Sequence, residues 1–350
     1  MKLLLPLLIL VANSYSFVVS SASSASSASS ASIELEFDKF DAIYQGQLGT
    51  TRGCLTPEKN VFRVCSDSLK NDGNAPYILH HNKVTEKVAV LFHGLSDSPF
   101  FFRSIARSIH QQGNNVIVVL LPGHGKNQAD ADMQDSGLAD RWRAHVLEVT
   151  EYAASLGEQR YLGGFSTGGA LATEYILQNP QSVKGLMLFS GALALDSSVE
   201  SIANIWGIQR LAKVLDGDYA TQGPNPYKYP SVARFSAIEL TEVIFSVRDL
   251  IEKGAPLNLP IFVAHSMADT TTLIIGVKNL IAVNSGPNTL FEISLDADVC
   301  HADLVINEEQ LSDMQFDTSM PEHVSSCNVP KANPKHAEML GSLKQFLSTY

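Results

Sequence analysis

The feature that most constrains this chain is a serine between glycines, placed where a strand-like segment meets a helix-like one. The string Gly164-Phe165-Ser166-Thr167-Gly168 follows the apolar pair Tyr161-Leu162 and precedes the helix-like run 169–177. A serine held on a sharp strand-to-helix turn, a nucleophile elbow, needs such glycines because larger neighbours would collide. The string alone also fits an ordinary glycine-rich turn. Its surroundings therefore decide between the two interpretations.

A second apolar strand upstream ends in a glycine. The run 87–92 predicts a buried strand, and His93-Gly94-Leu95-Ser96 follows it. A glycine after a strand lets the backbone turn its amides inward, where they can stabilise the oxyanion formed when a serine attacks an acyl group. We expect the N–H groups of Leu95 and Thr167 to be these donors. We expect His93, at the end of a buried strand, to be a hydrogen-bonded structural residue rather than a catalytic one.

Two further short strands end in loops that carry an acid and a histidine. The run 259–265 leads to Asp269, and the run 288–293 leads to His301. A histidine can take the proton of a serine hydroxyl, and an acid can hold the imidazole in the required tautomer and stabilise its charged form. The sequence therefore predicts that Ser166, Asp269 and His301 act together. Three nearby residues are less suitable partners because of their places in the chain: Asp296, Asp298 and His265.

With these segments the chain resembles the α/β-hydrolase superfamily, in the branch of monoacylglycerol lipases, small bacterial carboxylesterases and serine aminopeptidases. The order serine, acid, histidine, each after a different strand, is the order that this superfamily uses. The resemblance implies hydrolysis of carboxylic esters through an acyl-enzyme at Ser166. It also implies that His124 shapes a pocket rim. The matching segments, from about Val84 to the C-terminus, are His93–Ser96, Leu121–Gly125, Gly164–Gly168, Met267–Thr270 and His301–Leu304.

Strand-like and helix-like segments alternate along most of the chain. This alternation predicts an α/β fold with a mostly parallel central sheet covered by helices on both faces, and the resemblance implies that this is the α/β-hydrolase fold. A chain of 350 residues can form one such domain, residues 33–350, with an inserted helical cap. We expect Ser98 to cap the first helix and Gly113 to end it. The expected helices are 99–112, 140–156 and 336–347, and a further strand is 183–189.

The alternation stops between about residues 192 and 254, where the superfamily inserts its cap. Two amphipathic runs, 201–215 and 237–253, flank the proline-rich and aromatic stretch 223–230. The apolar stripes of these two runs can either cover the sheet or face a pocket above Ser166. We expect most of the apolar residues to cover the sheet. Some apolar cap residues should face the serine, because the pocket must exclude water. The residues that we expect there are Trp206, Tyr227 and Phe235.

The N-terminus resembles a secretory signal. Lys2 precedes the apolar run 3–12, which is too short to span a bilayer, and small residues follow up to Ala22. We therefore expect a signal peptide over residues 1–22, a flexible Ser/Ala-rich leader over 23–32, and an exported protein, periplasmic or extracellular, with no stable membrane span. The alternative is a buried N-terminal strand or helix, which the Ser/Ala repeat disfavours.

Export would let the four cysteines form disulfides. Three pairings are possible, and we favour Cys54 with Cys65 and Cys300 with Cys327, because each pair is close in sequence. The second bridge would anchor the loop 303–326 beside the catalytic histidine. A zinc site is the alternative, but the cysteines lack the C-x-x-C spacing of such sites.

Composition limits the possible partners. The net charge of −11, with only 17% charged residues, argues against a nucleic-acid surface, which needs clustered Lys and Arg. We expect a small-molecule ester or lipid substrate, with neither an organic cofactor nor a metal. Two other functions remain open, a serine aminopeptidase and a non-catalytic binding protein. An aminopeptidase would need cap carboxylates for the substrate amine, and the available ones are Glu200, Glu239 and Glu242.

Overall fold

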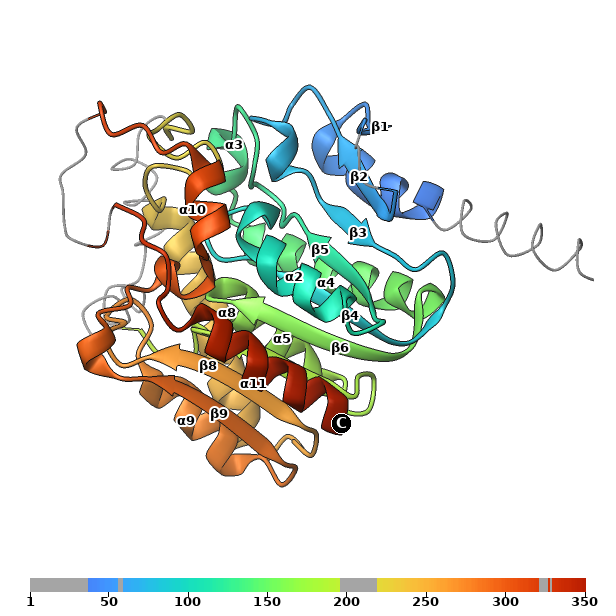
Figure 1. The fold of residues 1–350 in the computed structure, drawn as a ribbon, viewed down its shortest axis with the longest axis vertical. Helices are drawn as coiled ribbons and strands as arrows, with labels where there is room; N and C mark the ends of the chain where they lie inside the picture. Colours follow the sequence, from blue (N-terminus) through green and yellow to red (C-terminus); the bar gives the residue numbers. More distant parts are fainter. Residues whose placement is uncertain (1–36, 56–58, 196–218, 321–326, 328) are drawn as a thin grey trace, which may run out of the picture.

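A mixed β-sheet forms the centre of the molecule (Figure 1). The structure, a computed structural model, describes residues 37–55, 59–195, 219–320, 327 and 329–350. Within these residues the sheet has nine strands, in the order β1-β2-β3-β5-β4-β6-β7-β8-β9. The strands are β1 (Arg52–Gly53), β2 (Val61–Cys65), β3 (Tyr77–Leu79), β4 (Thr85–Phe92), β5 (Asn115–Val119), β6 (Gly157–Phe165), β7 (Gly185–Phe189), β8 (Ile261–Ser266) and β9 (Asn288–Ile293).

The sheet divides into an antiparallel edge and a parallel body. Strands β1, β2, β3 and β5 pair antiparallel in that order, whereas β5, β4, β6, β7, β8 and β9 pair parallel. Parallel strands place all their carboxyl ends at one edge of a sheet, where open α/β folds bind ligands. The expected α/β-hydrolase fold with a mostly parallel sheet is confirmed.

Side chains of the parallel strands alternate between two cores. On β4, Val88 and Val90 point into one core cluster, and Ala89 and Leu91 into the other. Because both faces are buried, the strands are apolar throughout rather than alternating. Helices α2 and α11 cover the face turned to the viewer in Figure 1, and α4, α5 and α8 lie behind the sheet. The helices are α2 (Arg103–His110), α3 (Asp130–Met133), α4 (Leu138–Tyr152), α5 (Thr167–Gln178), α8 (Arg234–Glu252), α9 (Ile274–Val283), α10 (Glu308–Met314) and α11 (His336–Thr349).

The helix expected over 99–112 is divided in the structure. A 3-10 helix, Pro99–Phe102, precedes α2. Ser98 occupies the capping position, but its side chain makes no capping hydrogen bond. Three consecutive phenylalanines, Phe100 to Phe102, are all buried, and a 3-10 turn directs them differently from an α-helix. Gly113 follows α2 with φ +90°, as expected for a helix end.

The segment 192–254 is described only in part. The expected helix 201–215 lies outside the described residues. The expected helix 237–253 corresponds to α8, whose Val243, Ile244 and Val247 are buried in the core shared with α5. Its apolar stripe therefore covers the sheet, which is what we expected for most of the stripes in this segment. The proposed signal peptide and leader also lie outside the described residues.

Both expected disulfides are present. Cys54 is bonded to Cys65, and Cys300 to Cys327. The first closes a short loop between β1 and β2, and the second joins the loop after β9 to the segment before α11. Among the residues that the structure describes, no helix has the length and apolar character needed to cross a membrane.

Candidate functional site

Ser166 lies on a strained turn between β6 and α5. Its backbone has φ 52° and ψ −118°, a conformation that an L-residue keeps only where the surroundings enforce it. Its N–H donates to the carbonyl of Phe189 at 3.1 Å. A Cβ on Gly168 would overlap the carbonyl of Phe92, and one on Gly164 would overlap the backbone of Gly168. The flanking glycines are thus required by close backbone packing, as expected of a nucleophile elbow.

The two amides expected to form the oxyanion hole flank this turn. Thr167 is the first residue of α5, so its N–H has no partner within the helix. Leu95 lies in the tight turn after β4, which the Asp97 N–H closes on the Gly94 carbonyl at 3.2 Å. Neither the Leu95 nor the Thr167 N–H has a hydrogen-bond acceptor among the described residues. Both amides are therefore available to a ligand.

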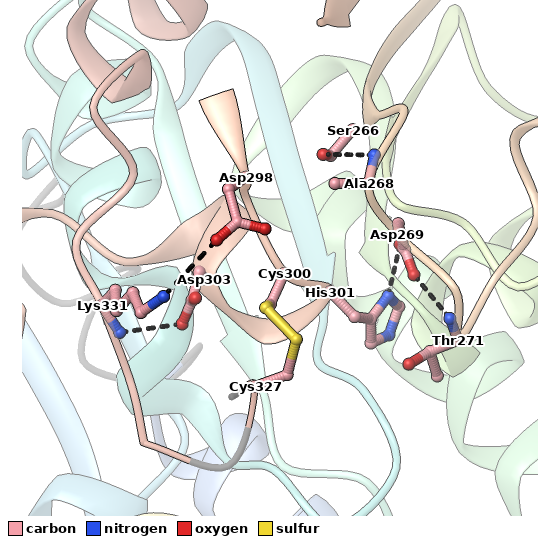
Figure 2. Close-up of a disulfide and its surroundings, with 10 residues drawn as sticks. All are labelled: Ser266, Ala268, Asp269, Thr271, Asp298, Cys300, His301, Asp303, Cys327 and Lys331. Atoms are coloured by element: carbon pink, nitrogen blue, oxygen red, sulfur yellow. Dashed lines mark hydrogen bonds and ion pairs between the residues drawn. A yellow bond between two sulfur atoms is a disulfide. The ribbon is translucent and has the colours of Figure 1, made fainter. Parts of the chain in front are cut away.

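The acid and the histidine meet on loops after neighbouring strands (Figure 2). Asp269 follows β8, His301 follows β9, and Nδ1 of His301 lies 2.6 Å from Oδ2 of Asp269. Oδ1 of Asp269 accepts the N–H groups of Thr271 and Thr272, at 2.9 and 3.0 Å. Burial alone would raise the pKa of Asp269, but the neighbouring imidazole and the hydrogen bonds outweigh it and lower the pKa to about 2. Asp269 is therefore an ionised partner for the imidazole.

The histidine ring lies beside the elbow. The centroids of the His301 and Phe165 rings are 4.8 Å apart, and Phe165 directly precedes Ser166. Ser166 is only 6% exposed, while the His301 side chain is 15% exposed. The loops that carry the serine, the acid and the histidine therefore meet at the carboxyl edge of β6, β8 and β9.

Thr272 is a residue of this site that the sequence analysis missed. Its hydroxyl lies 2.9 Å from Oδ2 of Asp269, 3.2 Å from the Ser190 carbonyl and 3.3 Å from Nδ1 of His301. The side chain is fully buried. A hydroxyl has only one proton, so the carboxylate and the carbonyl compete for it. The sequence does show a run of three threonines directly after Asp269. Only the third of them, Thr272, directs its hydroxyl to the carboxylate.

His93 is a structural residue, as expected. Its Nδ1 lies 2.8 Å from the Gly94 carbonyl, and its Nε2 accepts the Leu121 N–H at 3.1 Å. These two contacts require a neutral ring protonated on Nδ1. Burial, followed by the nearby His124, holds the pKa of His93 well below its ordinary value. The ring therefore braces the ends of β4 and β5 against each other.

His124 and His265 are also buried. Nδ1 of His124 lies 3.0 Å from the Pro122 carbonyl, and its ring stacks on Tyr229 at 6.3 Å between centroids. Burial lowers the pKa of His124 to about 4. Nε2 of His265 lies 3.0 Å from the Thr272 carbonyl and 3.7 Å from Oδ2 of Asp269. His265 thus lies beside the loop that carries Asp269.

The two alternative acids lie away from the imidazole. Asp296 and Asp298 are both exposed. Oδ2 of Asp298 lies 3.7 Å from Nζ of Lys331. Among the contacts of the described chain, neither acid touches His301, and Asp269 is the acid that the structure pairs with it.

A pocket opens beside the histidine loop, with a volume of about 110 Å³. Its lining combines aromatic residues, prolines, a lysine and the buried acid Asp303: Phe101, Pro224, Asn225, Lys228, Tyr229, Pro230, Ala302, Asp303, Ile306, Phe316, Cys327 and Pro330. Two of the three residues expected in a pocket above Ser166 do not line this one. Tyr227 stacks on Phe100 with 3.8 Å between ring centroids, and Phe235 is buried in the first turn of α8. The third, Trp206, lies outside the described residues.

Within the described ranges, no cluster of three or more His, Cys, Asp or Glu residues could hold a metal ion. The cysteines that could have supplied thiolates are joined in disulfides.

Comparisons with known proteins show which proteins this chain is similar to. A curated relative, Lipase 1 of Psychrobacter immobilis, is 27% identical over 146 residues, which are 41% of this chain and 44% of that lipase. The chain thus spans less than half the length of this relative. One of the metagenome-derived lipolytic enzymes LipS and LipT superposes with a TM-score of 0.55 at 18% identity, over 69% of this chain and 94% of the other. The monoacylglycerol lipase of Paleococcus ferrophilus superposes with a TM-score of 0.53 at 16% sequence identity, over 75% of this chain and 94% of that lipase.

At these identities the solved structures establish the fold. The family described as serine aminopeptidase, S33 (Hydrolase_4) matches residues 83–282, which is more than half of the chain and includes both the Leu95 turn and the elbow. The chain therefore belongs to the S33 serine aminopeptidase family of the α/β-hydrolase superfamily.

Proposed function

We propose that this protein is an exported serine hydrolase that cleaves carboxylic esters, with Ser166, His301 and Asp269 as its catalytic triad. The single observation that supports this most strongly is the contact of 2.6 Å between Nδ1 of His301 and Oδ2 of Asp269, with the imidazole beside the elbow that carries Ser166. Relatives with lipase names support an ester or lipid substrate.

In the proposed mechanism, Nε2 of His301 takes the hydroxyl proton of Ser166 as its oxygen attacks the ester carbonyl carbon. The imidazolium that forms is stabilised by ionised Asp269. The N–H groups of Leu95 and Thr167 donate to the oxyanion. His301 then gives its proton to the leaving alcohol, and an acyl-enzyme remains. Water, deprotonated by the same imidazole, attacks the acyl-enzyme, releases the acid and restores the Ser166 hydroxyl.

Replacement of the serine tests this proposal. Ser166→Ala should lower the turnover of p-nitrophenyl butanoate by at least about 10³-fold and abolish labelling by a fluorophosphonate probe. Ser108→Ala, in α2 on the face of the sheet opposite to α5, is the matched control and should keep both. Substantial turnover by Ser166→Ala would remove the serine mechanism. A wild-type protein that neither labels nor hydrolyses would be a non-catalytic binding protein.

Aminopeptidase activity is the second candidate, because the family carries that description. Such an enzyme needs carboxylates directed at a substrate amine. Glu239 is buried and accepts the Ala139 N–H at 3.2 Å, and Glu242 lies 2.7 Å from Nη1 of Arg143. Both contacts join α8 to α4. The third candidate, Glu200, lies outside the described residues.

Assays of p-nitrophenyl esters beside aminoacyl anilides separate the two activities. We expect ester turnover to exceed anilide turnover, because the carboxylates of α8 are engaged within the scaffold. Higher kcat/KM for the anilides would make the aminopeptidase assignment the correct one.

The proposed export rests on the signal-like residues 1–22 and on the two disulfides, which persist in oxidising compartments. Mass spectrometry of protein recovered from the periplasm or medium should give an N-terminus close to residue 23. Full-length protein found only inside the cell would contradict export while leaving the proposed chemistry intact.

A further inference from the structure

We propose that Lys228 is a positioning residue for the oxyanion hole, because its ion pair with Asp97 holds the turn that directs the Leu95 N–H. This inference rests on the ester hydrolysis proposed above, with Leu95 as an oxyanion donor. It gives a role to the proline-rich and aromatic segment 223–230, which the triad mechanism does not use.

The turn after β4 has a backbone conformation that its surroundings must maintain. Ser96 has φ 64°, in the left-handed region that residues other than glycine seldom occupy without support. The Asp97 N–H donates to the Gly94 carbonyl at 3.2 Å and closes the turn. Because Leu95 and Ser96 are adjacent, relaxation of Ser96 would also move the Leu95 N–H.

Two consecutive residues of the segment 223–230 contact this turn. The Tyr229 N–H donates to the Ser96 carbonyl at 2.8 Å. The Lys228 ammonium forms an ion pair with Oδ1 of Asp97. The segment therefore holds the turn by one backbone hydrogen bond and one ion pair.

The carboxylate of Asp97 packs directly on the turn. A Cβ added to Gly94 would lie 2.5 Å from Oδ2 of Asp97 and 2.9 Å from the ring of Phe165. Phe165 directly precedes Ser166, and its ring centroid lies 4.8 Å from that of His301. A shift of the Asp97 carboxylate would therefore move the turn relative to the elbow and the histidine.

The segment 223–230 is itself anchored to the body of the fold. Nδ2 of Asn71 donates to the Pro226 carbonyl at 2.8 Å, and Nζ of Lys70 donates to the Lys228 carbonyl at 3.2 Å. The Tyr229 hydroxyl donates to a carbonyl in the loop after β5 at 3.1 Å. The ammonium of Lys228 therefore extends from a fixed backbone, as a support for the turn requires.

Stability alone is a weak reason for this ion pair. Asp97 is only 2% exposed and the Lys228 side chain 31% exposed, so the cost of removing the charges from water offsets much of their attraction. What the pair supplies is a fixed geometry. Active-site donors must be held within about 0.5 Å of their productive positions, and a misplacement of about 1 Å can lower the rate about 10²-fold.

The test measures how tightly each variant binds a mimic of the oxyanion. The Ser166 oxygen attacks the carbonyl carbon of 1,1,1-trifluoropentan-2-one, the proton passes to His301, and the hemiketal oxygen becomes negative in the oxyanion hole. The inhibition constant Ki therefore reports the hole, whereas KM for p-nitrophenyl butanoate reports binding of the uncharged ester.

Lys228→Met and Asp97→Asn should each raise Ki and lower kcat by about tenfold to thirtyfold, with KM within about twofold of the wild type. This loss is below the roughly 10²- to 10³-fold that follows removal of an oxyanion donor, because the Leu95 N–H stays present but loses its direction. The double variant should lose no more than the larger single loss, because both changes break the same contact.

Asp97→Asn also separates positioning from a direct effect of charge. The variant keeps the Lys228 ammonium and removes a nearby negative charge, so a direct electrostatic role of Lys228 would lower Ki and raise kcat. Positioning predicts the opposite change in both quantities. Lys228→Arg restores the ion pair and should recover most of the wild-type Ki and kcat.

Lys278→Met is the matched control. Nζ of Lys278 lies 2.6 Å from Oε2 of Glu292, and its side chain is 39% exposed, close to the 31% of Lys228. This pair joins α9 to β9 rather than the segment 223–230 to the turn, so Ki and kcat should stay near their wild-type values. Should Lys228→Met not fold, as judged by its thermal transition, the double variant decides, because it leaves no unpaired buried carboxylate.

Three results would overturn the positioning role of Lys228. These are an unchanged Ki in the folded variants, a lower Ki in Asp97→Asn, or a rise in KM as large as the rise in Ki, which would indicate a general disturbance of the site. Failure of the proposed function looks different, because the wild type would then neither hydrolyse p-nitrophenyl butanoate nor react with the fluorophosphonate probe.

Discussion

Two buried aspartates follow the last two strands, and their pKa values are shifted in opposite directions. Asp269 receives two backbone N–H groups on Oδ1, and on Oδ2 the Thr272 hydroxyl and the His301 ring. Asp303 receives one backbone N–H on Oδ1, and its Oδ2 has no partner in the described part of the chain. The pKa of Asp269 is lowered to about 2, whereas that of Asp303 is raised to about 6.

The neighbouring imidazole and the number of donors, rather than burial, separate the pKa values of the two carboxylates. Asp269 is 5% exposed and Asp303 is 2% exposed, so both lose their hydration. The turn that carries Asp269 folds its own amides back onto the carboxylate and thereby stabilises a permanent charge. Asp303 depends on the backbone of Lys331, from a distant segment. The first carboxylate is suited to stabilise an imidazolium, whereas the second keeps one oxygen without a donor among the described residues.

The largest expected effect comes from neutralising each acid in turn. Asp269→Asn should lower kcat on p-nitrophenyl butanoate by about 10³- to 10⁴-fold, because an amide cannot hold the imidazole in the required tautomer. Asp303→Asn should lower it far less, since that carboxylate does not contact the imidazole. Steady-state kinetics of both variants measure the difference, with Asp296→Asn as an exposed control. Similar losses in the two variants would remove the distinction between the acids.

The disulfide between the two carboxylates gives the next effect (Figure 2). Removing it by Cys300→Ser with Cys327→Ser should reduce the free energy of unfolding by about 3.5 kcal/mol, the chain-entropy value for a loop of this size. Activity should fall as well, because Cys300 adjoins His301. Urea unfolding and ester turnover provide the two measurements.

The other disulfide is the matched control for this change. The bridge between Cys54 and Cys65 closes a shorter loop, with a sequence separation of 11 against 27, at the far edge of the sheet. Its removal should lower stability while leaving kcat of the folded protein near the wild-type value. If the two double variants lose activity in the same proportion, the Cys300–Cys327 bridge has no special effect on the histidine.

A smaller effect is expected from one donor of Asp269. Thr272→Val removes the hydroxyl at 2.9 Å from Oδ2 and should lower kcat about tenfold with little change in KM, because hydrogen bonds to a charged group contribute roughly 1.5–3 kcal/mol. The loss of a donor should also raise the pKa of Asp269, which a carboxyl titration by NMR would detect. Thr272→Ser keeps the hydroxyl and should retain most of the activity. An inactive Thr272→Ser would instead indicate a packing role for the methyl group.

The sequence was sufficient for the parallel sheet, the elbow and both disulfides. Each depends on a local pattern: apolar runs for the strands, glycines where Gly164 and Gly168 pack against backbone, and short spacings for the cysteines. The pairing of Asp269 with His301 was predictable because each follows a strand of the same sheet, and parallel strands end together. The 3-10 helix at Pro99–Phe102 was not predictable from a local pattern. It depends on the burial of three adjacent phenylalanines in the core.

Within the site, the sequence did not reveal the directions in which individual side chains point. The spacing of the threonines after Asp269 does not reveal that Thr272 alone turns back to the carboxylate. Tyr227 was expected in a substrate pocket, yet it stacks on Phe100, while its neighbours Lys228 and Tyr229 line the pocket beside the histidine. In an irregular, proline-rich stretch no periodicity fixes which residue faces inward. Asp303 was overlooked because nothing in the sequence marks a buried carboxylate of which one oxygen lacks a donor.

The smallest expected effect concerns how the free energy of unfolding depends on pH. Asp269 and Asp303 should contribute to this dependence with opposite signs. The folded pKa of Asp269 lies below its ordinary value, so its stabilisation is complete above pH 4 and is lost only as the pH falls towards 2. The folded pKa of Asp303 is about 6 against an ordinary 3.8, so the unfolded chain releases this proton first. The wild type should therefore lose stability through Asp303 as the pH rises from about 4 to 6.

Asp303→Asn isolates this contribution, because asparagine does not titrate. The charges that act on Asp303 are Lys331 and Lys228, which lower its pKa, and Asp298, which raises it, and the variant keeps all three. Between pH 4.5 and 7 the unfolding free energy of the wild type should fall by about 1–2 kcal/mol relative to that of the variant. Urea titrations at both pH values measure the change. A difference that does not vary with pH would mean that Asp303 is as well supplied with donors as Asp269.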